Sequence, residues 1–250
     1  MQIQLIRNAT LRLAYANRKF VTDPFLAAKG TLRSFVDISP NPLVDLPCPP
    51  EEVIEDIEMV LVSHLHSDHF DQVAQELLPK NLPLFCQSGD ETALAEKGFQ
   101  SVVAVEQSAQ WQGITLTRTP AQHGTGAWVE RMGNVSGFVF QAENEPTVYW
   151  VGDSIWYEPV KQVITDFQPD IIITHSSGAK FGDSDPIVMD AEQTIAVCQA
   201  APQATVIAVH LESLDHGTVS RAGLRAAADA QGIRSEQLLI PADGEQLSFN

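Results

Sequence analysis

The stretch Met59-Val60-Leu61-Val62-Ser63-His64-Leu65-His66-Ser67-Asp68-His69 carries the strongest signal in the chain. Residues 58–62 are mostly apolar and predict a buried strand, and the spacing of apolar residues from Asp71 to Leu78 predicts a helix. Between them, four imidazole or carboxylate groups lie within six residues, in a chain with only seven histidines. This density predicts a metal site rather than an ordinary turn.

The spacing within this cluster indicates two neighbouring ions. A tight strand-to-helix loop points His64 and His66 one way, and Asp68 and His69 another. Imidazole nitrogen and carboxylate oxygen suit Zn²⁺, Mn²⁺ or iron at a catalytic site. The alternative interpretation is a polar helix start, with Ser67 or Asp68 as the N-cap.

Three more candidate ligands follow apolar strands elsewhere in the chain. His123 comes after the expected strand 114–118, Asp153 lies in Gly152-Asp153-Ser154 after 147–151, and His210 ends 204–209. The loops at strand ends are where folds of the α/β class place reactive groups. Each position alone is weak evidence for a metal ligand, but their order and placement together indicate one shared site.

The remaining pattern predicts one α/β domain over residues 1–250. The opening segment suggests three short antiparallel strands, with turns near Asn8 and Asn17. Further strands are expected at 82–86, 101–105, 114–118, 135–141 and 147–151, and a helix at 90–97. The last third predicts helices at 159–167, 191–200 and 221–231, each followed by a strand (170–174, 204–209 and 237–240). Such alternation favours a sheet-rich core with helices outside.

Composition and charge narrow the possible partners. The formal net charge is −17, with only 15 Lys and Arg residues, and nucleic-acid binders normally present clustered basic side chains. No stretch approaches the roughly 18 apolar residues of a membrane-spanning helix. The N-terminal segment alternates polar and apolar residues, unlike a signal peptide. Three scattered cysteines (Cys48, Cys86 and Cys198) imply no disulfide framework and favour the cytoplasm. We expect a small-molecule substrate, without nucleic acid or membrane.

The order H-x-H-x-D-H, then histidine, then aspartate after glycine, then histidine resembles the metallo-β-lactamase superfamily. Segments 152–157, 189–192 and 209–212 look like a bacterial branch of general metal-dependent hydrolases related to ascorbate-phosphate lactonases. The resemblance extends from Thr22-Asp23-Pro24 to residues 241–245. It implies a four-layer αββα sandwich with metals at one edge between the sheets.

The resemblance also implies a role for each ligand. His64, His66 and His123 would bind the first ion, whereas Asp68, His69 and His210 would bind the second. Asp153 would bridge the two ions, with zinc as the expected metal and manganese or iron as alternatives. A hydroxide held between them would attack the substrate, and Asp68 would accept or deliver a proton. No Ser or Cys nucleophile is required, and no Gly-x-Ser-x-Gly motif occurs.

Four other residues are candidates with open roles. Asp23, before Pro24, is expected to hydrogen-bond a ligating histidine, unless it only forms a turn. His175 stands where that branch more often has asparagine, so it contacts substrate, donates a proton or is an interior histidine. His216 is a candidate substrate-binding residue at the site mouth, unless its role is structural. Lys180 is a candidate partner for an anionic substrate group, unless it is simply solvated.

Three reactions compete at this stage. The preferred one is hydrolysis of a small ester, lactone or related acyl compound. The second is hydrolysis of a small-molecule phosphodiester, since the lack of a basic arm counts against RNA. The third is iron-dependent redox chemistry; the reducing di-iron relatives have glutamate at the second histidine of the cluster, which is His66 here. The sequence leaves the substrate, the metal and the oligomeric state open.

Overall fold

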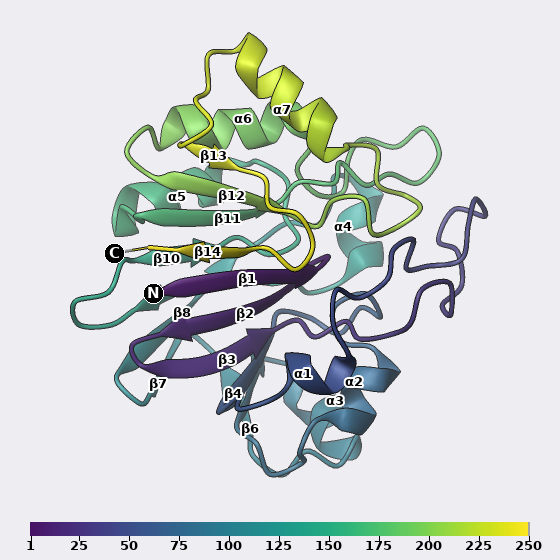
Figure 1. Cartoon of the computed structure of the whole chain (residues 1–250), viewed down its shortest axis with the longest axis vertical. Helices are drawn as coiled ribbons and strands as arrows, with labels where there is room; N and C mark the ends of the chain where they lie inside the picture. Colours follow the sequence, from purple (N-terminus) through teal and green to yellow (C-terminus); the bar gives the residue numbers. More distant parts are fainter. Residues whose placement is uncertain (250) are drawn as a thin grey trace.

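The computed structural model describes residues 1–249 and contains two seven-stranded sheets packed face to face (Figure 1). The first sheet has the order β14 (Gln246–Ser248), β1 (Gln2–Arg7), β2 (Thr10–Tyr15), β3 (Arg18–Thr22), β4 (Met59–Val62), β5 (Leu84–Gln87), β6 (Val102–Val105). The second has the order β13 (Leu238–Leu239), β12 (Thr205–Val209), β11 (Ile171–His175), β10 (Val148–Trp150), β9 (Ser136–Gln141), β8 (Ile114–Pro120), β7 (Ser108–Trp111). Each half of the chain thus builds most of one sheet.

Helices cover the outer face of each sheet (Figure 1). The first sheet carries α1 (Pro50–Val53), α2 (Gln72–Leu77) and α3 (Glu91–Glu96), and the second carries α5 (Glu158–Phe167), α6 (Ala191–Ala200) and α7 (Arg221–Ala230). A further short helix, α4 (Ala127–Met132), lies beside the loops at one edge of the sandwich. The predicted four-layer αββα architecture is confirmed.

Three apolar layers hold this arrangement together. They form because successive side chains along each strand point to opposite faces of the sheet. The central layer lies between the sheets, where Phe20 of β3 meets Phe140 of β9 with ring centroids 5.8 Å apart. Opposite faces of the same sheets pack against helices, as Val60 of β4 does near Ala74 of α2. A corresponding layer lies under α5, α6 and α7. Burial on both faces explains why strands such as 59–62 are apolar throughout.

The predicted elements agree with the structure to within a few residues, including the three opening strands and their turns. Asn8 and Asn17 both adopt positive φ, which asparagine tolerates better than most residues. Four short elements were not predicted: α1, β7, α4 and β14. None of the α4 residues is buried and β14 has three residues, so neither produces an apolar period long enough to recognise.

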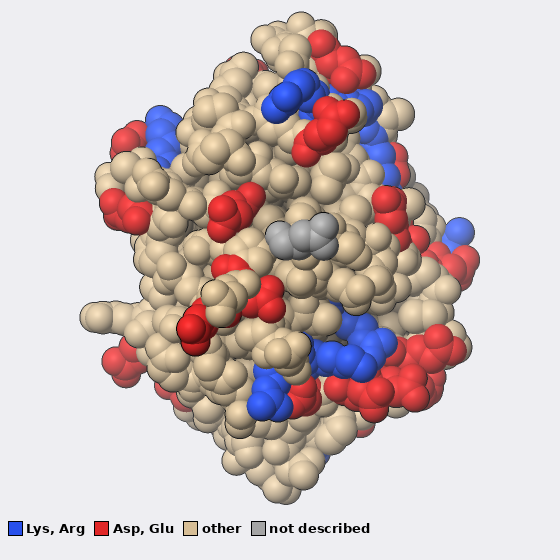
Figure 2. Space-filling model, turned by 60° about the vertical axis from the view of Figure 1, so that its left-hand side comes forward, with Lys and Arg blue, Asp and Glu red and all other residues tan. Residues whose placement is uncertain are grey.

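The two ends of the molecule differ in what they expose. The chain termini meet at one end, where the Met1 amino group donates to the Phe249 carbonyl at 3.0 Å, and the long loops gather at the other (Figure 1). Over the face in Figure 2, acidic side chains are scattered and most basic ones lie beside them. Within residues 1–249, none of the helices combines the length and apolarity needed to cross a bilayer.

Candidate metal centre

The predicted cluster forms the loop between β4 and α2. His64, Asp68 and His69 are buried, whereas His66 is only partly covered. The helix that follows begins at Asp71, whose side chain accepts a hydrogen bond from the Ala74 amide at 2.9 Å. Asp71 is therefore the N-cap, and neither Ser67 nor Asp68 serves that purpose. The side chains of the cluster are free for another role.

The other half of the site comes from the second sheet. His123 follows β8, Asp153 follows β10 and His210 follows β12, and all three side chains are buried. Gly152 makes the position of Asp153 possible: its φ is +72°, and a Cβ there would lie 2.5 Å from the Ser136 carbonyl oxygen. Only glycine fits such a close backbone approach. The structure thus brings together all the strand-end residues that the sequence singled out.

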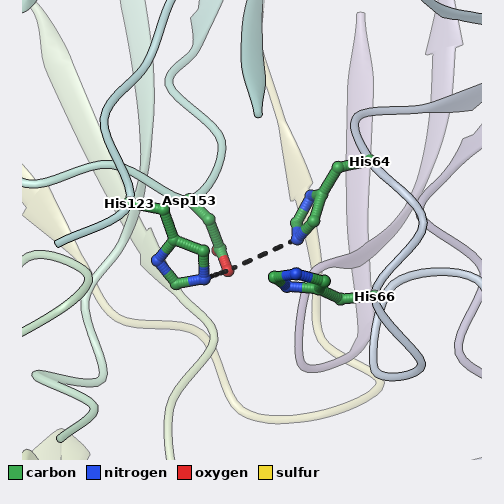
Figure 3. Close-up of side chains that lie close together, drawn as sticks. All are labelled: His64, His66, His123 and Asp153. Atoms are coloured by element: carbon green, nitrogen blue, oxygen red, sulfur yellow. Dashed lines mark ion pairs between the residues drawn. The ribbon is translucent and has the colours of Figure 1, made fainter. Parts of the chain in front are cut away.

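Asp153 lies at the centre of the first group of side chains (Figure 3). Its Oδ2 is 3.2 Å from His123 Nε2 and 3.8 Å from His64 Nε2. His64 and His66 approach from one side, and His123 and Asp153 from the other. One ligand atom from each of these four residues lies within 4.8 Å of the others, as a shared ion requires.

A second group lies next to the first and shares Asp153. It contains His69, Asp153, His175 and His210, again with ligand atoms within 4.8 Å of one another. Asp68, which the sequence placed here, lies at its side: its Oδ2 is 3.3 Å from Nε2 of both His69 and His210. The structure therefore adds His175 to the neighbourhood of the second expected ion.

Partners behind the histidines fix which ring nitrogen faces the centre. His123 Nδ1 donates to the Ile187 carbonyl at 2.8 Å, which leaves Nε2 as the free nitrogen. His69 Nδ1 lies 2.6 Å from Asp23 Oδ2, as expected for a residue that orients a ligand from behind. Asp23 also accepts from the amide and hydroxyl of Ser63. Such partners commonly orient metal-binding histidines.

The donor set fits divalent ions. Among residues 1–249, His64 Nε2 and His69 Nε2 are buried without a hydrogen-bond partner, although both point toward carboxylates. Buried polar atoms are rarely left unsatisfied, and an ion is the partner that imidazole nitrogens and carboxylates share. The residues present are therefore suited to hold metal.

The pKa values of the buried cluster residues depend on burial and on the charges of their neighbours. Burial disfavours the charged form of Asp153, but the imidazoles of His69, His210 and His123 hold its pKa well below the usual range. Burial lowers the pKa of His64, and the neighbouring imidazoles of His69 and His66 lower it further. His69 behaves in the opposite way: burial disfavours its charged form, but the carboxylates of Asp153, Asp68 and Asp23 raise its pKa well above the usual range, so a metal ion bound there would displace a proton.

Two site residues have a backbone conformation that is unusual for their type. His210 has φ +64° and Asp23 has φ +40°, both in the left-handed region that favours glycine. The surrounding contacts hold these conformations: the His210 amide donates to the Asn8 carbonyl at 2.9 Å, and the Asp23 amide donates to that of Leu61, also at 2.9 Å. Strain of this kind concentrates at functional sites.

An apolar cavity of about 190 Å³ opens above the cluster. Its base contains His66, Ser67, Asp68, His123 and Asp153, and its walls contain Phe35, Met132, Phe181, Ile187 and His216. His216 lies between two aromatic rings, with centroids 5.0 Å from Phe35 and 5.4 Å from Phe181. His216 is thus part of the cavity wall, and its role in binding substrate stays a prediction. Lys180 and His175 are not among the lining residues.

The wall residue Phe35 is held by a carboxylate distant in sequence. Asp215 accepts hydrogen bonds from the Phe35 amide at 3.0 Å, from Asn41 Nδ2 at 2.9 Å and from the Ser34 hydroxyl. Burial opposes ionisation of this carboxyl, but these bonds outweigh it and hold the pKa well below the usual range. Asp215 thereby ties loop 34–41 to the segment that carries His216.

Several of these contributors escaped the sequence analysis. Asn8, which was interpreted only as a turn residue, donates from Nδ2 to the Asp68 carbonyl at 2.9 Å. Ser63, Phe35 and Asp215 carry no pattern that separates them from ordinary loop or strand-end residues. Their roles depend on which segments meet in space, and nothing in the local sequence specifies that.

Comparison with known proteins agrees with this geometry. Residues 18–211 match the family described as Beta-lactamase superfamily domain. The protein YddR of Bacillus subtilis, assigned to UPF0173, is 38% identical over the full length of both chains. A solved structure of a possible metal-dependent hydrolase from Veillonella parvula has a TM-score of 0.95 and 34% identity, and covers 100% of this chain and 99% of that one.

A second solved structure resembles the chain almost as closely. It is an isothiocyanate hydrolase from Delia radicum gut bacteria, with a TM-score of 0.92 and 34% identity over 100% of this chain and 99% of that chain. Other relatives are named UPF0173 metal-dependent hydrolases, such as one from Xanthobacter autotrophicus that is 25% identical over 69% of this chain and 70% of its own length. The fold, the cluster of histidines and aspartates, and these relatives together identify the chain as a metal-dependent hydrolase of the metallo-β-lactamase superfamily, in its UPF0173 family.

Proposed function

We propose that this enzyme hydrolyses a small, uncharged substrate at an electrophilic carbon, with two divalent ions held by His64, His66, Asp68, His69, His123, Asp153 and His210. The observation that carries the proposal is the apolar cavity directly above the metal-competent cluster. Zinc is the first choice of metal for this donor set, with manganese or iron as alternatives.

The cavity favours neutral substrates. Of the residues described, no Lys or Arg lines it, and the candidate cation Lys180 is not among the lining residues. The chain as a whole carries a net charge of −17, which repels anions. A phosphodiester, the second reaction class, would enter without a cationic partner from the protein. The volume of about 190 Å³ lies below the roughly 300–1,000 Å³ typical of ligand sites and restricts the substrate to a small molecule.

Divalent ions held by these residues would lower the pKa of water from about 15.7 to roughly 7 and would polarise the substrate. The chain supplies the rest. Asp68 lies at the cavity base with a carboxylate that can accept a proton and return it to the leaving group. Phe35, Phe181 and Ile187 exclude water from the apolar part of the substrate. His216 can donate a hydrogen bond between the two aromatic walls.

Two substrate classes fit this description. An isothiocyanate, R–N=C=S, has an electrophilic central carbon, and addition of one water gives the amine R–NH₂ and carbonyl sulfide. The full-length relative with that activity makes it the first class to test. The carbonyl carbon of a small ester, lactone or related acyl compound has similar electrophilic character and the same need for an apolar pocket. Iron-dependent redox chemistry is the less favoured alternative.

The test begins with metal content per chain, followed by a panel of isothiocyanates, lactones, esters and phosphodiesters of matched size. We expect about two ions of zinc or manganese per chain and turnover of at least one neutral class. Turnover of phosphodiesters alone would contradict the proposal. Stoichiometric iron with a visible absorption band would favour the redox alternative.

A wall variant connects the activity to this cavity. Phe181→Ala removes an aromatic ring from the lining and should raise KM for substrates with larger apolar groups about tenfold, as expected for roughly 1–3 kcal/mol of lost apolar contact. Phe167→Ala, in a separate groove between α5 and β8, is the matched control. Equal effects of both variants would indicate that the cavity does not hold the substrate.

We also propose a cytoplasmic location, which the three free cysteines favour.

A further inference from the structure

His175 lies beside the site without facing the cavity. It ends β11 and is 0% exposed, as is Trp150 at the end of the neighbouring strand β10. Its Nδ1 is 2.6 Å from Asp153 Oδ1, and its Nε2 is 3.0 Å from the indole nitrogen of Trp150. The ring therefore stands between an indole and the carboxylate at the centre of the cluster.

These contacts determine the tautomer of His175. An indole N–H can only donate, so Nε2 must be the acceptor and carries no proton. In a neutral imidazole the proton is then on Nδ1, which donates it to Asp153 Oδ1. Both ring nitrogens are thereby satisfied by protein atoms.

The same contacts exclude His175 as a metal ligand, although its Nδ1 lies within range of the second group. If Nδ1 bound an ion, the neutral ring would carry its proton on Nε2, where it would face the Trp150 N–H. Two buried donors would then point at each other, and both would be left without an acceptor. No other partner for the Trp150 indole is found in the described chain.

We propose that Trp150 and His175 form a positioning pair for Asp153, the carboxylate proposed above to bridge the ions. The pair engages Oδ1 and so directs Oδ2 toward the ligand nitrogens of His64, His69 and His123. His175 is thus neither a ligand nor a proton donor to substrate. This inference rests on the proposed function only through the ligand role of Asp153.

Two substitutions at position 175 separate the two hydrogen bonds. His175→Asn places an amide N–H near the position of Nδ1 and can still donate to Asp153. His175→Gln places its amide near Nε2 and can accept from Trp150, but it has no donor at Oδ1. Trp150→Phe removes the indole donor. Phe138→Leu is its control, because the Phe138 ring stacks on Trp150 in the same apolar core, with centroids 6.1 Å apart, and has no hydrogen-bonding atom to offer His175.

The readouts are zinc content per chain and zinc affinity in competition with a chromophoric chelator. We expect His175→Asn to retain the wild-type zinc content and an affinity within a few-fold of the wild type. His175→Gln should lose about 10–100-fold in affinity, as substitutions behind metal ligands commonly do. Trp150→Phe should lose affinity more than Phe138→Leu does. Loss of one ion per chain in both His175 variants, or no loss in either, would overturn the inference.

Nitrogen NMR of the histidine rings tests the tautomer directly. A proton on His175 Nδ1, in the metal-free and in the zinc-loaded protein, is the expected result. A proton on Nε2 in the zinc-loaded protein would show that His175 is a ligand. Neither readout uses a substrate, so a wild-type protein that binds zinc but cleaves nothing in the panel contradicts the proposed function while leaving this inference intact.

Discussion

The two halves of the metal centre are built in different ways. One half is a single loop, where His64, His66, Asp68 and His69 follow β4 within six residues. The other half is assembled from His123, Asp153 and His210, which follow three different strands of the second sheet. A local motif can be recognised along the chain, whereas a distributed set becomes a site only when the strand ends meet.

The halves also differ in how they are held. Side chains orient the loop half, since Asp23 lies behind His69 and Ser63 lies beside His64. In the other half, a backbone carbonyl orients His123 and the Trp150–His175 pair contacts Asp153. Substitution behind the ligands can therefore weaken Asp153 and His69 in either half, whereas the orientation of His123 depends on the backbone and so on the fold itself.

Metal removal should have the largest effect, because ions would connect the two halves. Chelation should abolish hydrolysis and lower the melting temperature by roughly 10 °C, since free metal at 1,000 times its Kd contributes about 4 kcal/mol and each kcal/mol moves Tm by roughly 2–4 °C. Calorimetry with and without chelator measures this. An unchanged Tm would mean that the halves hold together without ions.

The second largest effect is expected from a substitution in the loop half, which should remove turnover. Asp68→Ala should lower kcat at least about 10³-fold, because a proposed ligand and proton carrier is lost together. Circular dichroism should show an intact fold, since the side chain lies at the cavity base rather than in the apolar core. Glu96→Ala, which removes an exposed carboxylate on α3 outside the cavity, is the control and should retain activity. Full activity of Asp68→Ala would refute the mechanism.

A smaller effect should follow from weakening the support behind the loop half. Asp23→Asn removes the charge that faces His69 Nδ1 at 2.6 Å, and should reduce metal affinity about 10–100-fold without removing a ligand. Titration with zinc measures the change. An affinity equal to that of the wild type would mean that the loop half does not need its supporting carboxylate.

The smallest expected effect concerns His216 and acid stability. Burial lowers its pKa to about 4 in the folded protein, against about 6.5 when unfolded. Its contribution to stability is therefore complete above pH 6.5 and is lost as the pH falls toward 4, by up to about 2 kcal/mol between pH 7 and 5. The Tm of His216→Gln should fall less over this range than that of the wild type. Parallel losses would show that His216 does not titrate as described.

The fold was largely predictable, because strands such as 59–62 and 205–209 are buried on both faces and their apolar runs are unambiguous. The candidate site was also largely predictable, since seven His and Asp residues stand at strand ends. What could not be predicted are contacts made across the fold, such as Trp150 with His175 or Asp215 with loop 34–41. Nothing in the local sequence distinguishes Trp150 from an ordinary core residue or Asp215 from an ordinary loop residue.

The left-handed backbone at His210 sets stability against function at a single position. A residue other than glycine held in this region costs of order 1–3 kcal/mol, and the metal-free protein bears that cost in full. Glycine at position 210 would relieve it and remove a proposed ligand at the same time. A laboratory selection for thermal stability in the absence of metal would therefore favour loss of this histidine. Natural selection for hydrolytic activity would retain the histidine at position 210.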